Sequence, residues 1–208
     1  MPDYNVKQGD CLSSIAARHG LFWEKVWNHP KNARLKEQRK DPNVLYPGDV
    51  VFVPDKEKKE ESGATEQRHR FRKKATPAKL RLELKHGEKP RANEPYTFEI
   101  DGQLFSGTTD DDGKLEHRIP PNAKRGKLLL GENKEEFQLD LGHLDPIEEV
   151  SGVQARLNNL GFDCGKVDEI LGPKTETAIN DFQKQNKLKI TGKIDQQTRD
   201  KLKQVYGC

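Results

Sequence analysis

The chain has 208 residues, of which 32% are hydrophobic and 34% charged, so its cores must be small and one large domain is not expected. Lys and Arg total 37 against 34 for Asp and Glu, and the net charge of +3 lacks the concentrated basic character of nucleic-acid-binding domains. The composition therefore predicts a soluble protein of several small modules and excludes nucleic acid as its expected partner.

The N-terminus shows no targeting segment. The start, Met1-Pro2-Asp3-Tyr4, leads into a strand-like stretch without a charged and apolar leader, and no apolar run is long enough to span a bilayer. We therefore expect no signal peptide and no membrane insertion. Three explanations stay open: a trimmed chain, synthesis in the cytoplasm with delivery to the periplasm or exterior by a non-Sec route, or a cytoplasmic role.

Residues 1–55 have the pattern of a small α/β module. Residues 4–7 alternate as a strand, Gln8-Gly9-Asp10 signals a turn, and a helix follows until Gly20. Trp23, Val26 and Trp27 place an apolar stripe on a second helix. We expect a basic loop from Pro30 to Lys40, then a turn at residues 45–49 and a last strand at residues 50–54.

This order, strand-helix-helix-strand, and the sequences of residues 4–16 and 45–49 resemble a LysM domain. The resemblance implies binding of N-acetylglucosamine polymers in a shallow groove between two loops. Tight glycine-bearing loops offer backbone groups to the N-acetyl amide, and apolar side chains cover the sugar. The expected groove residues are Gly9, Asp10, Cys11, Leu12, Leu45, Tyr46, Pro47 and Gly48.

Two features depart from the LysM pattern. Cys11 replaces the usual Thr, and the basic insertion lengthens the loop beside the second groove wall. Trp23 and Trp27 are expected in the core rather than in the groove, since large aromatic residues on an apolar stripe are usually buried.

Residues 56–75 are dense in charged side chains and read as a solvated tether. Its basic end, residues 69–74, could contact phosphate or an acidic partner, but a short charged run beside a domain is more often solvated.

Residues 76–143 alternate between apolar and polar residues, which predicts strands with one buried face. Asp101-Gly102 and Asp112-Gly113 are expected to form tight hairpin turns, so the segment is predicted to be an antiparallel β-sandwich. The stretch of residues 107–113 resembles transthyretin-like modules, which implies a spacer or docking domain. A calcium loop at residues 108–113 is disfavoured because the alternating oxygen ligands and distal Glu are missing.

Residues 144–208 show three helical stretches. The first carries an apolar face that ends at Gly161, the second begins at Gly172-Pro173, and Asp195 can cap a third. The segments at residues 153–157, 160–162, 167–168, 171–175, 182–183 and 191–192 resemble the three-helix peptidoglycan-binding domain. That family commonly holds wall hydrolases on the glycan-peptide mesh.

The expected ligand contacts of this C-terminal module are Asp168, Glu169, Leu171 and Thr175. Glu169 stands where the family usually has Gly, and Leu171 stands where an aromatic residue is common. Cys164 and Cys208 could pair within the module, and two free thiols are an equal alternative.

The sequence contains no recognised catalytic arrangement. It lacks a nucleophile elbow, a phosphate loop and a His-Glu-x-x-His helix, and its six histidines and three cysteines do not have metal-ligand spacing. We therefore expect no catalytic residue, no metal, no cofactor and no enzyme activity.

The fold expected is thus multidomain α+β, with a LysM-like domain at 1–55, a linker at 56–75, a sandwich at 76–143 and a three-helix domain at 144–208. The function expected is a peptidoglycan-binding adaptor whose two weak modules act together. The alternative is a structural component of a contractile injection (type VI secretion) apparatus that docks on a spike or effector protein. The missing leader motivates this alternative.

Overall fold

The computed structural model describes residues 3–57, 62–68, 70, 78–87 and 89–207. The chain divides into two compact units. One comprises Met1–Tyr4, Leu12–Arg34 and Val50–Asp140, and the other comprises Asn5–Cys11, Leu35–Asp49 and Leu141–Cys208. Of the basic end expected for the linker, residues 69 and 71–74 lie outside the described residues. No helix among the described residues is long and apolar enough to cross a membrane.

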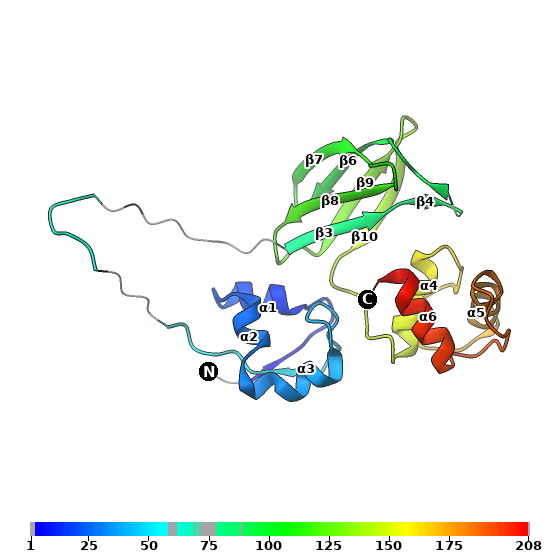
Figure 1. Cartoon of the computed structure of the whole chain (residues 1–208), viewed down its shortest axis with the longest axis horizontal. Coiled ribbons are helices and arrows are strands. Elements are labelled where there is room, and N and C mark those ends of the chain that lie inside the picture. The colour runs from blue at the N-terminus through cyan, green and yellow to red at the C-terminus, as the bar shows by residue number, and fades with distance from the viewer. Residues whose placement is uncertain (1–2, 58–61, 69, 71–77, 88, 208) are drawn as a thin grey trace. The chain divides into compact units, whose positions relative to one another are not determined.

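The N-terminal residues begin with β1 (Tyr4–Asn5), α1 (Leu12–Arg18) and α2 (Trp23–Trp27) (Figure 1). In α1 the apolar residues recur at helical spacing and are buried, and Gly20 follows the helix with a φ of 67°. Trp27 is in the core and Trp23 is half-buried, in line with the expectation that the tryptophans pack inward. The buried residues of α1 are Leu12, Ser14, Ile15 and Ala16.

The basic stretch from Pro30 to Lys40 is helical, so the expectation of a loop there is wrong. It forms η1 (Pro30–Asn32) and α3 (Ala33–Arg39). Pro30 occupies the first turn, where its missing N–H costs nothing, and Ala, Leu, Lys, Glu, Gln and Arg are good helix formers. Leu35 supplies the buried contact, and β2 (Val50–Val51) then pairs with β1 in a two-stranded sheet.

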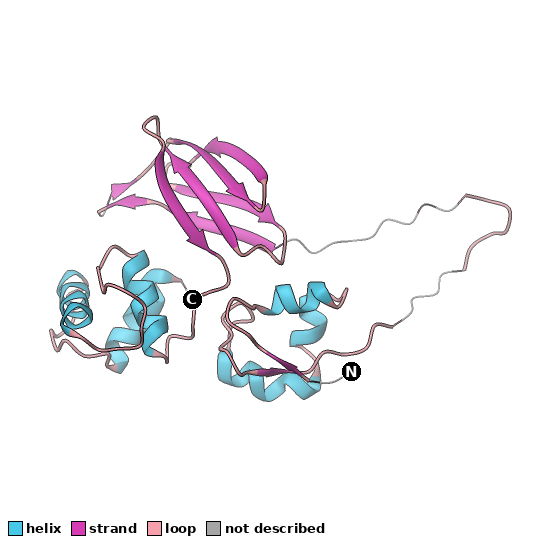
Figure 2. Cartoon of the chain, turned by 180° about the vertical axis from the view of Figure 1, so that it is seen from behind, coloured by secondary structure: helices cyan, strands magenta, loops and turns pink. Residues whose placement is uncertain are grey.

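A four-stranded antiparallel sheet of order β10-β9-β6-β7 organises the middle of the chain (Figure 2). Its strands are β6 (Pro95–Ile100), β7 (Gln103–Thr108), β9 (Arg125–Leu130) and β10 (Glu135–Asp140). Alternate residues of β6 and β9 are buried, which is the pattern of a sheet with one covered face. The buried members are Tyr96, Phe98, Ile100, Leu128 and Leu130.

Two smaller ladders complete this region. β3 (Ala78–Glu83) pairs antiparallel with β8 (Lys114–Ile119), and β4 (Lys85–His86) pairs with β5 (Lys89–Pro90). Tyr96 links the four-stranded sheet to β8, because its hydroxyl lies 2.7 Å from Nε2 of His117. The region is therefore antiparallel β structure, as expected. Its likeness to transthyretin-like modules stays a prediction.

The two expected hairpin turns differ. Asp101 and Gly102 have φ angles of 45° and 78° and join the paired strands β6 and β7, so this turn is confirmed. Asp112-Gly113 does not join paired strands, because β7 and β8 belong to different sheets. The chain crosses there in a wider turn, in which Asp110 Oδ1 accepts the N–H groups of Asp112 (3.0 Å) and Lys114 (2.7 Å).

The C-terminal residues form α4 (Val150–Asn159), α5 (Pro173–Gln185) and α6 (Gln196–Tyr206). The sequence signals hold at two helix starts. Gly172 precedes Pro173 at the start of α5, and the Asp195 carboxylate accepts the Thr198 N–H and caps α6. Apolar residues of the three helices and their loops share one core: Ile147, Val153, Leu157, Cys164, Ala178, Ile179, Phe182 and Leu202.

Candidate functional site

The first loop of the expected LysM groove is a closed turn at the end of β1. The Asp10 N–H donates to the Lys7 carbonyl (3.0 Å), and the Lys7 N–H donates to Asp10 Oδ2 (3.1 Å). Gly9 lies inside this turn with a φ of 81°, a conformation that favours glycine. Leu12, the last groove residue expected here, is fully buried, so it supports the loop from the core.

The second loop, residues 45–48, is held by Asp49. The Asp49 carboxylate accepts the Tyr46 N–H (2.9 Å) and two hydrogen bonds from Arg39, each 2.8 Å long. Both charged side chains are 8% exposed, and the hydrogen bond to Asp49 raises the pKa of the Arg39 guanidinium. A paired carboxylate with this geometry fixes the loop more firmly than a surface ion pair can.

The sequence analysis did not predict this ion pair between Arg39 and Asp49. The sequence pattern alone places Arg39 in a basic loop and Asp49 in a turn. The signal available in the sequence was the helix-forming composition of residues 33–39, which brings Arg39 to the end of a helix facing the turn.

Val6 brings the two loops to one place. Its N–H donates to the Asp49 carbonyl (2.8 Å), and its carbonyl accepts the Gly48 N–H (2.9 Å). Val6 directly precedes the turn that begins at Lys7. Its two hydrogen bonds therefore hold the loop at residues 7–11 next to the loop at residues 45–48. Tyr46 is half-buried, Pro47 and Gly48 are exposed, and Leu45 is buried. Thus Tyr46, Pro47 and Gly48 present the accessible side of the second loop.

Gln154 holds the loop with the contacts expected in the C-terminal module. Its Oε1 accepts the N–H groups of Asp168 (3.2 Å) and Glu169 (3.0 Å). The two protons of its Nε2 are shared among Asp168 Oδ1, the Ile170 carbonyl and Thr175 Oγ1, all at 3.1 Å. Gln154 is fully buried, so the exposed loop rests on an internal side chain.

The four contacts expected here therefore divide by role. Thr175 is 2% exposed and bonded to Gln154, so it belongs to the scaffold of the loop. The Asp168 carboxylate accepts the Ile170 N–H (3.0 Å), and this bond, with that from Gln154, lowers its pKa. Glu169 and Leu171 are exposed, and Leu171 keeps 59% of its surface.

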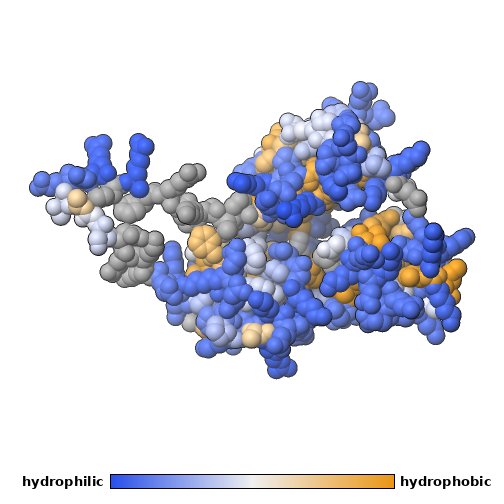
Figure 3. Space-filling view, in the orientation of Figure 1, coloured by the Kyte–Doolittle hydropathy of each residue, from blue (hydrophilic) through white to orange (hydrophobic). Residues whose placement is uncertain are grey.

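The same loop carries further apolar side chains on its surface. Val167 and Ile170 are exposed beside Leu171, and Ile190 is exposed in the loop after α5. Figure 3 shows hydrophobic surface over this C-terminal part of the chain. Side chains of this kind suit contact with the C–H face of a sugar or with a peptide methyl group.

Cys164 is a buried thiol of the C-terminal core. Burial raises its pKa to about 11, and the nearby charge of Asp163 adds to the shift. The partner suggested for it, Cys208, lies outside the described residues.

Comparison with known protein families gives a match at each end of the chain. The LysM domain family matches residues 4–36, and the peptidoglycan binding domain family PG_binding_1 matches residues 147–202. The chain thus carries a LysM domain in its N-terminal part and a peptidoglycan binding domain in its C-terminal region. These two domains support peptidoglycan binding. The loop at residues 45–48 lies beyond the matched LysM residues.

One curated relative is a spore cortex-lytic enzyme of Oceanobacillus iheyensis, which is 44% identical over 58 residues. The match covers 28% of this chain, and the chain spans about a fifth (21%) of the relative's length. No solved structure matches the chain significantly.

This relative contradicts the expectation that the chain is not an enzyme. The expectation rested on the absence of known catalytic motifs from the sequence, and short motifs identify only those families that use them. A segment 44% identical to part of a lytic enzyme contradicts it.

Proposed function

We propose that the chain binds peptidoglycan through two loop regions, one in each of its terminal domains. The LysM domain takes N-acetylglucosamine-containing glycan between residues 9–12 and 45–48, and the C-terminal domain contacts the same polymer through the loop at residues 168–171. The observation that carries this proposal is the presence of two peptidoglycan-type domains in one chain. We further propose the division into domains at 1–55, 76–143 and 144–208, joined by the charged linker 56–75.

The geometry of the loops supports the proposal. Each loop is fixed by a buried or nearly buried polar side chain, Asp49 in the first domain and Gln154 in the second. A loop fixed before the ligand arrives loses little conformational entropy on binding. Two weak sites on one polymer can then act together through effective concentration.

The proposal is tested by cosedimentation of the full chain with purified sacculi. Pro47→Glu places a charge on the accessible part of the LysM loop, and Leu171→Glu does the same on the C-terminal loop. Each change should lower the bound fraction, and both together should lower it further. Leu104→Glu is the matched control, because Leu104 is 71% exposed on β7 and belongs to neither loop. Equal binding by all variants would argue against these sites.

A second candidate function is lysis of the wall, and the cortex-lytic relative favours it. Incubation of the purified chain with sacculi, followed by chromatography of the released fragments, tests this directly. Released muropeptides would assign an activity, whereas intact sacculi with bound protein would leave binding as the function. The role in a contractile injection apparatus has no matching observation and stays a prediction of the sequence.

A further inference from the structure

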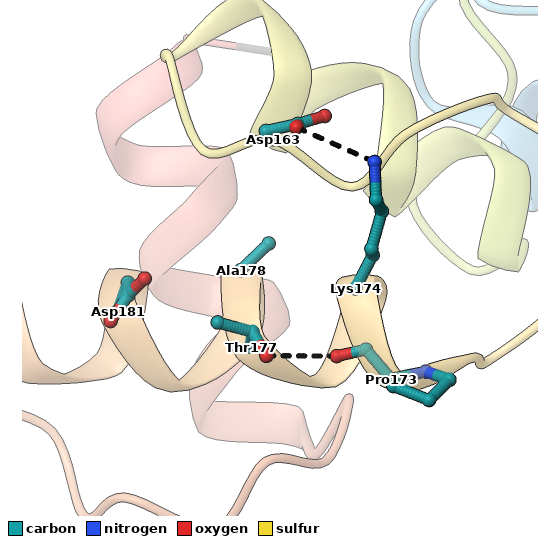
Figure 4. A pocket seen from close by; sticks show the side chains of 6 residues that line it. All are labelled: Asp163, Pro173, Lys174, Thr177, Ala178 and Asp181. Carbon is teal, nitrogen blue, oxygen red and sulfur yellow. Dashed lines mark hydrogen bonds and ion pairs between the residues drawn. The ribbon is translucent and has the colours of Figure 1, made fainter.

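A shallow pocket of about 380 Å³ opens on the C-terminal domain, at the start of α5 that directly follows the loop held by Gln154 (Figure 4). Its lining comes from the exposed side of α5 and from the turn that follows α4. Four of the lining residues stand at helical spacing along one stripe of α5, and Asp163 faces them from the turn. The complete lining is Asp163, Pro173, Lys174, Thr177, Ala178 and Asp181.

The pocket carries charges of both signs. Lys174 lies at one end and its Nζ is 3.9 Å from Asp163 Oδ2, a loose pair in which both side chains are about three-quarters exposed. Asp181 lies two turns further along α5, and among the described residues its carboxylate has no hydrogen-bond or ion-pair partner. The pocket thus offers a cation near one end and an unpaired carboxylate near the other.

The remaining polar groups are held in place by the backbone. Asp163 Oδ1 accepts the Gly165 N–H (2.8 Å), which orients its other oxygen toward Lys174. The Thr177 hydroxyl donates to the Pro173 carbonyl (2.9 Å), so the helix backbone fixes its orientation. Ala178 and Pro173 supply the apolar part of the lining.

The spacing of the charges selects a kind of ligand. Lys174 and Asp181 are seven residues apart, which is about 10 Å along a helix axis. An extended peptide of about three residues spans that distance. A neutral glycan has no charges to offer to either end, whereas a short peptide with an ammonium group and a carboxylate has both.

We propose that this pocket binds the peptide part of peptidoglycan, with the ligand carboxylate at Lys174 and a ligand ammonium group at Asp181. This inference rests on the proposed function, and it assigns different parts of the polymer to different sites. Glycan is bound at the LysM loops, and peptide is bound on α5.

The test is a titration of the isotope-labelled full chain, followed by NMR, with two soluble probes. The first probe is the tripeptide L-alanyl-γ-D-glutamyl-L-lysine, and the second is an oligomer of N-acetylglucosamine. The tripeptide should shift amide signals of residues 163 and 174–181. The oligomer should shift signals of residues 9–12 and 45–48 and leave those of α5 in place.

Charge reversals locate the binding groups. Lys174→Glu and Asp181→Lys should each weaken tripeptide binding by about five- to tenfold, because each replaces an attraction by a repulsion at a solvated site. The matched controls are Lys184→Glu and Asp200→Lys, which make the same charge changes on exposed helical positions outside the pocket. The controls should bind the tripeptide as the unaltered chain does.

The outcomes separate the two levels of the proposal. If the tripeptide leaves the α5 signals unmoved, or binds the reversed variants unchanged, the peptide site is wrong even when the oligomer and sacculi still bind. If the oligomer and sacculi also fail to bind, the proposed function itself is wrong.

Discussion

Gln183 of α5 holds the loop before α6 in the same way as Gln154 of α4 holds the loop before α5. Its Oε1 accepts the N–H groups of two successive residues, Thr191 (2.8 Å) and Gly192 (3.1 Å), and its Nε2 donates to Thr198 Oγ1 (2.8 Å). Both glutamines are fully buried. The C-terminal domain therefore repeats one loop-holding arrangement, and the first copy carries the exposed contacts.

The repeat predicts the effect of replacing Gln154. In Gln154→Leu the loop loses the bonds to Asp168 and Glu169, and these partly buried N–H groups lose their protein acceptor. We expect a loss of about 2–4 kcal/mol in the free energy of opening the loop. Hydrogen exchange of the Asp168 and Glu169 amides measures this. Gln204→Leu, on the exposed side of α6, is the control and should leave both rates unchanged.

The repeat also identifies a strained residue. Glu169 has a φ of 65°, and Gly192, its counterpart in the second copy, has the same angle. A non-glycine residue at such a positive φ costs about 1–2 kcal/mol. Glycine avoids this strain, but it loses more backbone entropy on folding, which offsets part of the gain. Glu169→Gly should therefore stabilise the C-terminal domain by about 0.5–1 kcal/mol in thermal unfolding. Lys184→Gly, within α5, should destabilise it by about 1 kcal/mol, and a loss for both would contradict the assignment.

The Arg39–Asp49 ion pair predicts a link between the stability of the loop at residues 45–48 and glycan binding. Arg39→Gln leaves the nearly buried Asp49 carboxylate without its cation, at a cost of about 3 kcal/mol. We expect faster hydrogen exchange of the Tyr46 amide and weaker binding of N-acetylglucosamine oligomers. Arg34→Gln, an exposed change on the same helix, serves as the control. Unaltered oligomer binding by Arg39→Gln would show that the Arg39–Asp49 ion pair does not contribute to glycan binding.

A close approach at Gly152 predicts that this position of α4 rejects any side chain. A Cβ atom there would lie 1.9 Å from the Pro146 carbonyl oxygen and 2.7 Å from that of Asp145. Gly152→Ala should destabilise the C-terminal domain by about 2–4 kcal/mol, because the backbone must move. Calorimetry measures the shift. Gly172→Ser meets open space before α5 and should change the stability by less than about 0.5 kcal/mol.

The Cys164 thiol predicts a dependence of reactivity on pH. Because burial raises its pKa to about 11, the thiol is almost entirely protonated near neutral pH, and the thiolate that attacks iodoacetamide is scarce there. Under reducing conditions the folded chain should be alkylated slowly at Cys164 near neutral pH and faster as the pH approaches 11. Mass spectrometry of the Cys164 peptide reports the rate, with the urea-unfolded chain as reference. Equal rates in both states would contradict the burial.

Local signals in the sequence predicted the features that depend on neighbouring residues. Asp101-Gly102 adopts positive φ angles in a hairpin, and Asp195 caps α6, because each depends on backbone within a few positions. The prediction of a hairpin at Asp112-Gly113 was wrong because strand pairing depends on residues far apart in the sequence. A dipeptide can supply a turn, but it does not determine which strands lie beside one another.

The parts of the site that the sequence did not reveal depend on distant partners. Gln154 bonds to residues 14 to 21 positions further along the chain, and Arg39 meets Asp49 ten positions away. A glutamine on a helix and an arginine in a basic stretch look alike whether they are solvated or buried. The sequence was enough to predict the LysM and peptidoglycan-binding domains. The interactions of Arg39 and Gln154 that fix their loops were visible only in the structure.

The most direct test of two-site binding compares the affinity of the full chain for intact sacculi with its affinity for a soluble N-acetylglucosamine oligomer. Two sites acting on one polymer predict that sacculi bind at least about 100-fold more tightly. They also predict that Pro47→Glu or Leu171→Glu alone removes most of this difference. Equal affinity for sacculi and oligomer would contradict the account, because it would mean that a single site does all the binding.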